Sequence, residues 1–273
     1  MIQLQLENTS TCNAKCGFCV YPEAERWGGR MSMDLYKKIL DEAGTIPLIS
    51  QICITGLGEP TLDKDLVERV KYARYRKPLG FIDIFTNGVY LTPEKFDALQ
   101  AAGLSSVQVS LNAVRAEQHE KIMGLKGKFD KVCEHIDYAR KNRKTCQVQA
   151  RAVINGDSFT NDDGNEFYTR WGMKDNGGVG SLIREGNWAG AGRTIRKFQP
   201  NEACHRALSQ IYVMFDGRVT TCCFDPSGKQ IFGDLTKQTL REIYQDTDYL
   251  AFREAHSENK ADKYPICAGC TRI

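Results

Sequence analysis

The chain of 273 residues has no apolar run long enough to cross a membrane, and its amino terminus lacks a basic segment followed by a hydrophobic one. A membrane-spanning helix needs about 20 mainly apolar residues, and a signal peptide begins with such a basic segment. Internal repeats and low-complexity segments are also absent. These absences predict a cytoplasmic protein without a membrane partner.

A strong excess of one charge is missing as well, since the formal net charge is only +3. Such a small balance does not by itself indicate a nucleic acid or an anionic membrane as a partner. The length is sufficient for a large core, and it predicts one main domain with a small appendage.

Cysteine, in contrast, is abundant, with 11 in the chain. The cytosol keeps thiols reduced, so many cysteines in a cytoplasmic protein indicate metal binding rather than disulfides. Cys53, Cys133 and Cys146 fall on the apolar pattern of predicted strands and helices, and we expect them to be small core residues. The remaining cysteines form one group near each end of the chain.

The first group, Cys12, Cys16 and Cys19, follows an apolar run at residues 2–6. A closed zinc site uses four protein ligands, so these three thiols cannot complete one. Three thiolates do suit a [4Fe–4S] cluster whose fourth iron is left open. A loop after a strand is also where parallel-sheet enzymes carry functional residues. The alternative is a group of thiols without metal.

Apolar runs alternate with segments of helical periodicity through the first two thirds of the chain. Strands are expected at residues 2–6, 49–54, 81–85, 106–111, 147–154 and 179–183. Helices are expected at residues 33–43, ending before Gly44, and at 63–77, 92–103, 128–142 and 165–171, with Ser32 and Thr92 as N-caps. This alternation predicts an α/β fold with a parallel sheet and crossover helices.

Three motifs together resemble the radical S-adenosylmethionine (AdoMet) superfamily. Residues 12–19 have the spacing Cys-x3-Cys-x-aromatic-Cys, residues 57–60 resemble a Gly-Gly-Glu-Pro segment, and residues 86–88 read Thr-Asn-Gly. Leu57 in place of the first Gly is a mild departure. The resemblance implies a TIM-like partial (β/α)6 barrel over residues 1–199.

The resemblance also implies that the open iron binds the amino and carboxylate groups of AdoMet. The contacts that carry over are Phe18 beside the adenine, the backbone of Gly58, Glu59 and Pro60 at the amino group, Ser110 and Asn112 at the ribose or carboxylate, and Arg151 at the carboxylate. From the residues alone, Ser110 and Asn112 could equally be turn formers, and Arg151 a structural ion-pair partner.

The second cysteine group lies in residues 200–273, where four thiols come from three places: Cys204, Cys222, Cys267 and Cys270. Four is the count for a fully ligated [4Fe–4S] cluster, although a four-Cys zinc site is the alternative. Residues 211–222 read as two strands around an Asp-Gly turn, and residues 240–244 as a helix. This pattern resembles twitch, the shortened SPASM module, which implies a small α+β domain with one auxiliary cluster.

Cys222 has a direct neighbour, Cys223, and only one of the two is expected to bind the cluster. Adjacent residues in a strand face opposite sides of the sheet. Gly217 precedes Cys222 by the five positions typical of the module, so we predict Cys222 as the ligand.

The superfamily resemblance implies reductive cleavage of AdoMet to a 5′-deoxyadenosyl radical, which takes a hydrogen atom from the substrate. A flavodoxin- or ferredoxin-type protein would supply the electron. A fully ligated auxiliary cluster would accept or relay an electron, which favours oxidation of a small polyol, sugar or related metabolite. In its single-cluster layout the chain resembles the inosamine dehydrogenases.

Two other classes of function stay open. The first is radical modification or isomerisation of a peptide, nucleotide or nucleic acid, and the second is a non-catalytic iron–sulfur or zinc protein. Arg184, Arg193, Arg196 and Lys197 flank a segment that contains Trp188, which suits an anionic substrate with a ring. The same segment could be a solvated connector.

Overall fold

The structure is a computed structural model that describes residues 1–20, 26, 28–154, 159–172, 180–184, 203–220, 222–268 and 270. The side chains of the basic segment around Trp188 lie outside the described residues. The expected domain boundary between residues 199 and 200 lies there too, so the division into two domains stays a prediction.

The described strands form one nine-stranded sheet in the order β6-β5-β4-β3-β2-β1-β7-β8-β9. All pairs from β6 to β7 are parallel, whereas β7–β8 and β8–β9 are antiparallel. The strands are β1 (Ile2–Leu6), β2 (Ile49–Cys53), β3 (Phe81–Thr86), β4 (Ser106–Ser110), β5 (Gln147–Ile154), β6 (Gly180–Arg184), β7 (Gln210–Val213), β8 (Arg218–Thr220) and β9 (Ile231–Asp234).

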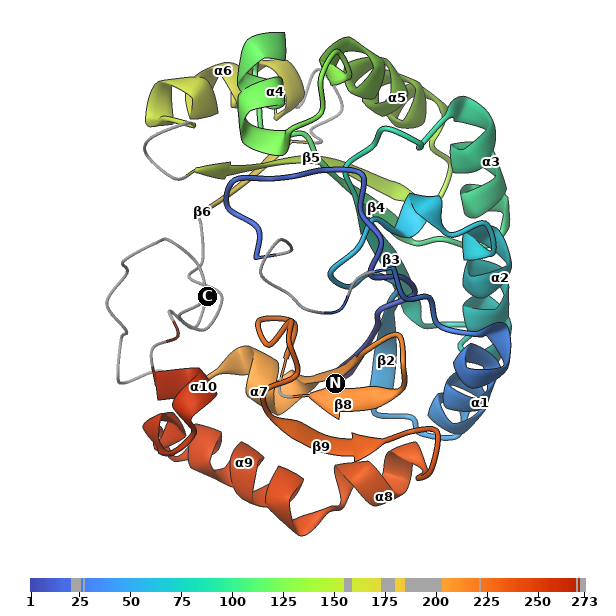
Figure 1. The fold of residues 1–273 in the computed structure, drawn as a ribbon. Coiled ribbons are helices and arrows are strands. Elements are labelled where there is room, and N and C mark those ends of the chain that lie inside the picture. The colour runs from blue at the N-terminus through green and yellow to red at the C-terminus, as the bar shows by residue number, and fades with distance from the viewer. Residues whose placement is uncertain are drawn as a thin grey trace.

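Helices cover the outer side of this curved sheet (Figure 1). They are α1 (Met33–Gly44), α2 (Leu66–Arg76), α3 (Pro93–Ala101), α4 (Ala116–Met123), α5 (Phe129–Asn142), α6 (Asn161–Trp171), α7 (His205–Ser209), α8 (Leu240–Tyr244), α9 (Thr247–Ser257) and α10 (Pro265–Ala268), with 3₁₀ turns at Pro60–Leu62 and Ala261–Lys263. The predicted fold class, a partial (β/α)6 barrel followed by a smaller part with a hairpin and helices, is confirmed.

The two faces of the sheet differ in polarity because side chains alternate along each strand. Leu4, Ile52 and Ile82 are neighbours in register, are fully buried, and pack in one core with apolar residues of the helices. The alternate positions face the inner side of the barrel and are largely polar: Gln5, Gln51, Cys53, Asp83, Gln108, Ser110 and Arg151. The core therefore lies between sheet and helices, and the inner side is free for chemistry.

The predicted N-caps are confirmed. The Ser32 hydroxyl accepts a hydrogen bond from the backbone N–H of Leu35, and the Thr92 hydroxyl accepts one from Lys95. Gly44, expected just past its helix, is the last residue of α1, and Thr45 is the C-cap. The helix expected from residue 63 begins only at Leu66, because the Asp63 carboxylate accepts a hydrogen bond from the backbone of Asp65 in the preceding turn.

Five of the described helices and strands were not predicted: α4, α7, α9, α10 and β9. Helix α4 has eight residues and buries only His119, Ile122 and Met123, so its apolar pattern is too short to stand out. The second hairpin strand was predicted to reach Cys222, but β8 ends at Thr220 and Cys222 begins a turn closed by the N–H of Asp225. The two-faced-strand argument for choosing between Cys222 and Cys223 therefore does not apply to them.

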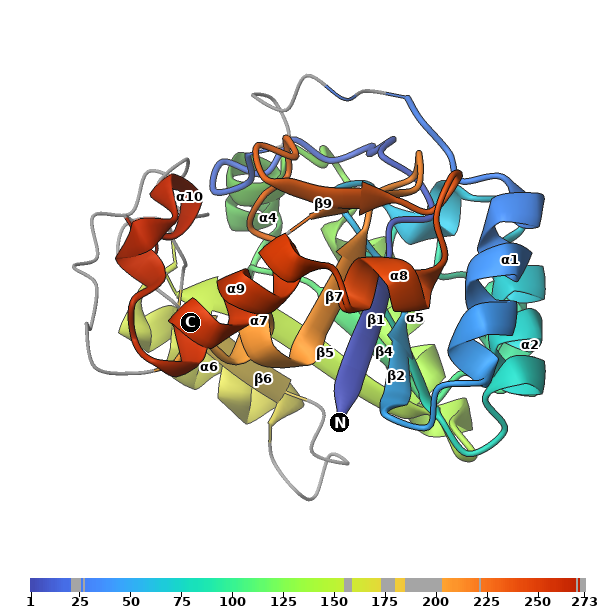
Figure 2. The ribbon, with the colours of Figure 1, turned by 90° about the horizontal axis from the view of Figure 1, so that it is seen from below.

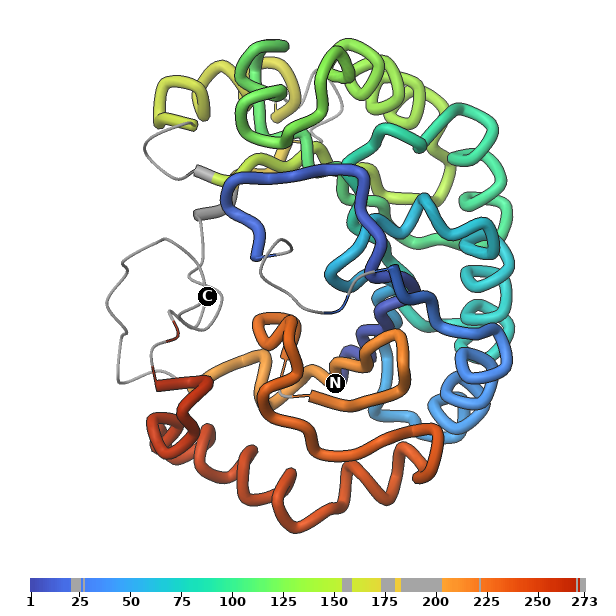
Figure 3. The backbone as a smooth tube through the Cα atoms, viewed as in Figure 1, coloured from blue at the N-terminus to red at the C-terminus, as the bar shows by residue number. Residues whose placement is uncertain are grey.

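The strand β7 lies beside β1, so the carboxyl-terminal strands continue the barrel sheet. Gln3 to Leu6 pair in parallel with Gln210 to Val213. Figure 3 shows the two chain segments running side by side, with the amino-terminal part in blue and the carboxyl-terminal part in orange. The segment that follows β1 lies at the carboxyl ends of the strands (Figure 2). None of the described helices is both long and apolar enough to span a bilayer.

Candidate cofactor and cluster sites

The loop that carries Cys12, Cys16 and Cys19 is fixed to the end of helix α4. The backbone N–H of Lys15 donates to the carbonyl of Met123 at 2.9 Å, and that of Gly17 donates to Ile122 at 2.9 Å. The N–H of Cys19 donates to the carbonyl of Cys16 at 3.0 Å, which closes a turn between two of the thiols. The unpredicted helix α4 is thus the support of the predicted cysteine loop.

The three thiols are near enough for the charge of each to affect the others. Burial raises the pKa of Cys12 to about 11, and the charges of Glu59 and Cys19 add to this increase. Burial also raises the pKa of Cys16, as do Cys19 and Cys12. Three thiolates held together in this way need a compensating positive centre, which iron would supply.

Gly58 makes the closest backbone approach to the cysteine loop. A Cβ atom at this position would lie 2.4 Å from the carbonyl oxygen of Thr9 and 2.6 Å from that of Thr11. The next residue, Glu59, donates its backbone N–H to the Thr11 carbonyl at 2.8 Å. Pro60 begins the 3₁₀ turn. The Gly-Glu-Pro segment therefore runs directly against the loop, as the predicted AdoMet contacts require.

The Glu59 carboxylate is fully buried and joins this segment to the Thr-Asn-Gly motif. It accepts hydrogen bonds from the Thr86 hydroxyl at 2.6 Å and from the backbone N–H of Asn87 at 2.7 Å. The Asn87 amide in turn donates to Asn13 Oδ1 at 2.8 Å. Burial raises the pKa of Glu59, and these hydrogen bonds offset the increase in part. The Glu59 side chain thus holds the Gly-Glu-Pro segment against the Thr-Asn-Gly motif, and the backbone of residues 58–60 is the part that could contact a ligand.

The remaining predicted AdoMet contacts lie at the ends of strands β4 and β5. Ser110 pairs in register with Arg151. Asn112 has a left-handed backbone (φ 52°), its Oδ1 accepts from the N–H of Val153 at 3.0 Å, and its amide lies 3.0 Å from the Met123 sulfur. Phe18 is half-buried and packs against the core. Ser110, Asn112 and Arg151 are thus neighbours, with the Asn112 side chain engaged by protein groups.

Arg151 is partly buried and has an unusual environment for a cation. Its Nη1 donates to Gln108 Oε1, and its guanidinium lies 5.3 Å from the centre of the Phe85 ring. Its Nε is buried and has no hydrogen-bond partner. Burial lowers the pKa of Arg151, and the Asp83 carboxylate opposes this effect. An unpaired buried donor of this kind is costly, so it indicates a place for a ligand atom.

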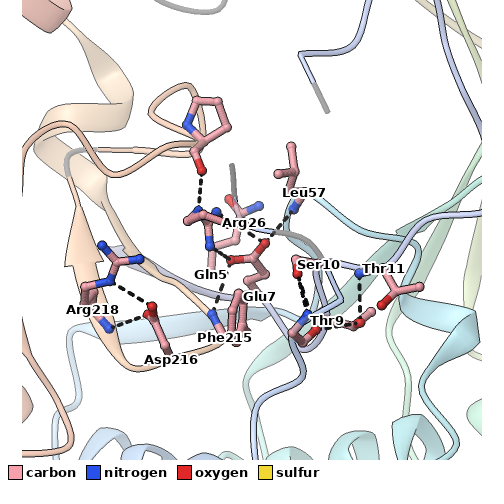
Figure 4. Close-up of polar contacts among 12 residues, drawn as sticks. Gln5, Glu7, Thr9, Ser10, Thr11, Arg26, Leu57, Phe215, Asp216 and Arg218 are labelled. Carbon is pink, nitrogen blue, oxygen red and sulfur yellow. Dashed lines mark hydrogen bonds and ion pairs between the residues drawn. The ribbon is translucent and has the colours of Figure 1, made fainter. Parts of the chain in front are cut away.

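Sequence reasoning missed the buried ion pair between Glu7 and Arg26, drawn in Figure 4. The Glu7 carboxylate accepts from Arg26 Nη1 at 3.0 Å, from the N–H of Leu57 at 3.3 Å and from the N–H of Phe215 at 3.2 Å. Arg26 Nε also donates to the Pro226 carbonyl at 2.6 Å. One carboxylate therefore joins the start of the cysteine loop, the Gly-Glu-Pro segment and the hairpin turn after β7.

The tail thiols converge from separate elements. Cys204 caps α7, Cys222 follows β8, and the N–H of Cys270 donates to the carbonyl of Cys267 at 3.2 Å. Burial raises the pKa of Cys222 well above its ordinary value, and Cys223, Cys204 and Cys270 add to the increase. Burial also raises the pKa of Cys223, which the Arg206 guanidinium opposes through a hydrogen bond. Cys204, Cys222 and Cys270 are thus close in space.

Residues 7–156 match the radical SAM superfamily, and residues 204–271 match the SPASM iron–sulfur cluster-binding domain. The chain belongs to the radical SAM superfamily. This radical SAM protein is 36% identical to the PqqA peptide cyclase of Rhodopseudomonas palustris over 141 residues, which cover 51% of this chain and 35% of that protein. The chain thus spans about a third of the length of that relative.

A second relative matches from end to end. The S-adenosyl-L-methionine-dependent 2-deoxy-scyllo-inosamine dehydrogenase of Niallia circulans is 23% identical over 271 residues, which cover 99% of this chain and 92% of that protein. The crystal structure of BtrN in complex with AdoMet and 2-DOIA has a TM-score of 0.72 at 20% identity, and the match covers 100% of this chain and 94% of that one. This likeness supports the fold.

Membership of the radical SAM superfamily with a SPASM domain implies AdoMet and two [4Fe–4S] clusters as cofactors. The residues fit them. Within each of the two cysteine groups, thiols affect the charge of their neighbours, and Gly58 lies against the backbone of residues 9–11, directly before the first group. Within the described part of the chain, no three His, Cys, Asp or Glu side chains are spaced to hold one metal ion. A cubane is larger than one ion and binds each thiolate through a different iron.

Proposed function

We propose that this radical SAM protein oxidises a small polyol, sugar or related metabolite. When bound, AdoMet and the first cluster supply one-electron cleavage of AdoMet and removal of a substrate hydrogen atom. The observation that carries the proposal is the end-to-end match to a 2-deoxy-scyllo-inosamine dehydrogenase, which spans both cysteine groups. Relatives that match only about half of this chain give no information about the carboxyl-terminal cysteines.

The chain's own residues would have three tasks in this reaction. Cys12, Cys16 and Cys19 would hold the first cluster, with the charge coupling of their thiols in support. The backbone of Gly58 to Pro60, with Phe18, Ser110 and Asn112, would hold AdoMet. For Arg151 the sequence predicts the AdoMet carboxylate, but the nearby Asp83 charge favours a ligand group without negative charge. The polar inner face of the barrel would bind and orient the substrate.

The tail would hold the second cluster through Cys204, Cys222, Cys267 and Cys270. Four thiolates leave no iron free for a substrate, so electron transfer is the chemistry that such a cluster supplies. A site that accepts an electron favours net oxidation. A flavodoxin- or ferredoxin-type protein would supply the electron for AdoMet cleavage.

A second function is supported by the 36% identity to a peptide cyclase over about half of the chain. In that case the substrate would be a peptide or another macromolecule rather than a small metabolite. The tail that matches the dehydrogenase makes this the weaker of the two proposals.

The test is an anaerobic turnover assay of the protein reconstituted with iron and sulfide, with AdoMet, dithionite and 2-deoxy-scyllo-inosamine or scyllo-inositol. We expect about one ketone per 5′-deoxyadenosine with at least one of these probes. A variant with Cys12, Cys16 and Cys19 all changed to Ala should form neither product. Formation of 5′-deoxyadenosine without any ketone from polyols would contradict the oxidation and direct the search to peptides.

A further inference from the structure

A carboxylate, Asp83, and a guanidinium, Arg151, lie on the inner face of the barrel without direct contact. Asp83 on β3 and Arg151 on β5 form no ion pair within 4.0 Å, and the side chain of Gln108 on β4 lies between them. Gln108 Nε2 donates to Asp83 Oδ2 at 3.5 Å, while Gln108 Oε1 accepts from Arg151 Nη1. The three side chains thus form one line across neighbouring strands.

The two oxygens of Asp83 are not equally engaged. Oδ1 accepts a hydrogen bond from Gln51 Nε2 at 3.0 Å, whereas the contact from Gln108 to Oδ2 is at the outer limit of a hydrogen bond. The carboxylate is only 1% exposed, so water does not compensate for this weak contact. The Cys53 thiol also donates to this carboxylate, and a stronger donor from a ligand could replace the weak contact from Gln108.

At the other end of the line, Arg151 Nε is buried and has no acceptor. The site thus offers one acceptor atom, Asp83 Oδ2, and one donor atom, Arg151 Nε. A carboxylate ligand would satisfy Arg151 but would be repelled by Asp83. A hydroxyl group both donates and accepts, so it satisfies the two atoms together.

The ion pair between Asp63 and Arg69 is the comparison, although Arg69 Nη1 is also buried without a hydrogen-bond partner. Arg69 Nε contacts Asp63 Oδ2 directly at 2.6 Å, and both side chains are fully buried. Asp83 and Arg151 instead both contact the Gln108 amide, which lies between them. The lack of a direct contact, more than the unpaired Arg151 Nε, therefore distinguishes this pair from the Asp63–Arg69 pair.

We propose that Asp83 binds a substrate hydroxyl group and accepts its proton, with Arg151 and Gln108 holding the hydroxyl oxygen. This inference rests on the proposed oxidation of a polyol. After loss of a hydrogen atom from carbon, conversion of the carbinol radical to a ketone releases one proton and one electron. The proton goes to the Asp83 carboxylate, and the electron goes to a one-electron acceptor of the iron–sulfur class. The C–O bond becomes double as the O–H bond breaks.

The charge state of Asp83 suits this task. Burial raises its pKa to about 6, and hydrogen bonds from Gln51 and the Cys53 thiol, with the Arg151 charge, limit the increase. These are the groups that face the carboxylate from β2, β4 and β5, together with Gln108. A base with a pKa just below the working pH is ionised and is still a good proton acceptor.

The first test measures the binding of scyllo-inositol by anaerobic calorimetry at pH 5 and pH 8. The protein is reconstituted and has AdoMet bound, and scyllo-inositol has no group that titrates in this range. Wild type should bind at pH 8 and lose about tenfold in affinity at pH 5, because protonated Asp83 no longer accepts a hydrogen bond in the same way. Asp83→Asn should bind at least tenfold more weakly at pH 8 and show no pH dependence. Asp63→Asn, the matched buried control, should keep the pH dependence.

The second test measures turnover of 2-deoxy-scyllo-inosamine. Asp83→Asn should still cleave AdoMet but should form about 100-fold less ketone and lose the fall in rate below pH 6. If Asp83→Asn does not fold, which its iron content would reveal, Arg151→Gln replaces it. That variant should weaken scyllo-inositol binding about tenfold and keep its pH dependence.

The outcomes separate this inference from the function on which it rests. If polyol binding depends on Asp83 but no ketone forms, the proposed oxidation is wrong, whereas the proposed hydroxyl-binding site is retained. Ketone formation with equal rates and pH profiles in wild type and Asp83→Asn would overturn the role of Asp83 alone. No binding of either polyol, or a loss of AdoMet rather than polyol affinity in Arg151→Gln, would overturn the hydroxyl site.

Discussion

Gly58 is the residue at which one added carbon atom should disturb the AdoMet site most directly. Its Cβ would lie 2.4 Å from a backbone carbonyl oxygen of the cysteine loop, and backbone cannot move aside as a long side chain can. Such overpacking costs about 1–3 kcal/mol. We expect Gly58→Ala to lower AdoMet affinity at least tenfold, as measured by anaerobic equilibrium dialysis.

Gly17 is the matched control for this substitution. It lies in the same loop, has no positive φ, and its added Cβ would meet no atom within 4 Å. Gly17→Ala should therefore keep the affinity for AdoMet. Equal affinities of the two variants would argue that the backbone approach at Gly58 has no part in binding.

The sequence was most informative about residues whose chemistry is rare. Cys12, Cys16 and Cys19 stand out because a thiol has few other uses at that spacing in a reduced compartment. Glu7 and Asp83 do not stand out, because a single acid in a strand has no motif. Their signal is weaker: Asp83 is a charged side chain between two isoleucines of β3, and Glu7 directly follows the last residue of β1.

At the scale of elements, the Glu7–Arg26 pair fixes β1, the Gly-Glu-Pro segment and the β7–β8 turn relative to one another. Loss of one partner leaves the other charge buried without compensation, which costs about 3–5 kcal/mol. We expect Glu7→Gln to lower the melting temperature of the reconstituted protein by roughly 10 °C, as measured by calorimetry.

Two comparisons make this expectation specific. Asp137→Asn removes a partly exposed i,i+3 pair with Arg140 and should change the melting temperature by a degree or two at most. Glu7→Gln combined with Arg26→Gln should recover part of the loss, because the uncompensated charge is gone. A Glu7→Gln protein as stable as the Asp137→Asn protein would show that the pair does not hold these elements together.

Helices and strands with a strong apolar pattern could be predicted from the sequence. The helix that holds the cysteine loop in place could not. The expected strands β1 and β5 have the observed bounds, and α1 and α3 have the expected N-caps. Helix α4, which supports the cysteine loop, has a weak pattern because only a few of its residues are buried. Its position is set by tertiary contacts at Lys15 and Gly17, which no local pattern reveals.

At the scale of the whole molecule, the sheet joins the two cysteine groups. The pairing of β7 with β1 sets residues about 200 positions apart side by side, and such a long-range pairing cannot be inferred from hydrophobic periodicity. It has a functional consequence. Cys223 influences the pKa of Cys53 on β2, so this tail cysteine borders the inner face of the barrel, on which Asp83 also lies.

We predict different roles for Cys222 and Cys223. The charges of Cys204 and Cys270 both affect Cys222, whereas that of Cys270 affects Cys223, which is hydrogen-bonded to Arg206 and near Cys53. The test uses the variant with Cys12, Cys16 and Cys19 changed to Ala, so that only tail iron is counted. That background should bind about four irons per chain.

Addition of Cys222→Ala to this background should lower bound iron below four and change the electron paramagnetic resonance spectrum of the reduced protein. Addition of Cys223→Ala should change neither the bound iron nor the spectrum, because the Cys223 thiol is hydrogen-bonded to Arg206 and is not needed as a fourth ligand. The reverse pattern would assign the ligand to Cys223, and one zinc without iron in the background variant would replace the auxiliary cluster by a structural metal. In that last case the molecule would have no built-in electron acceptor, and an oxidation would require an external one.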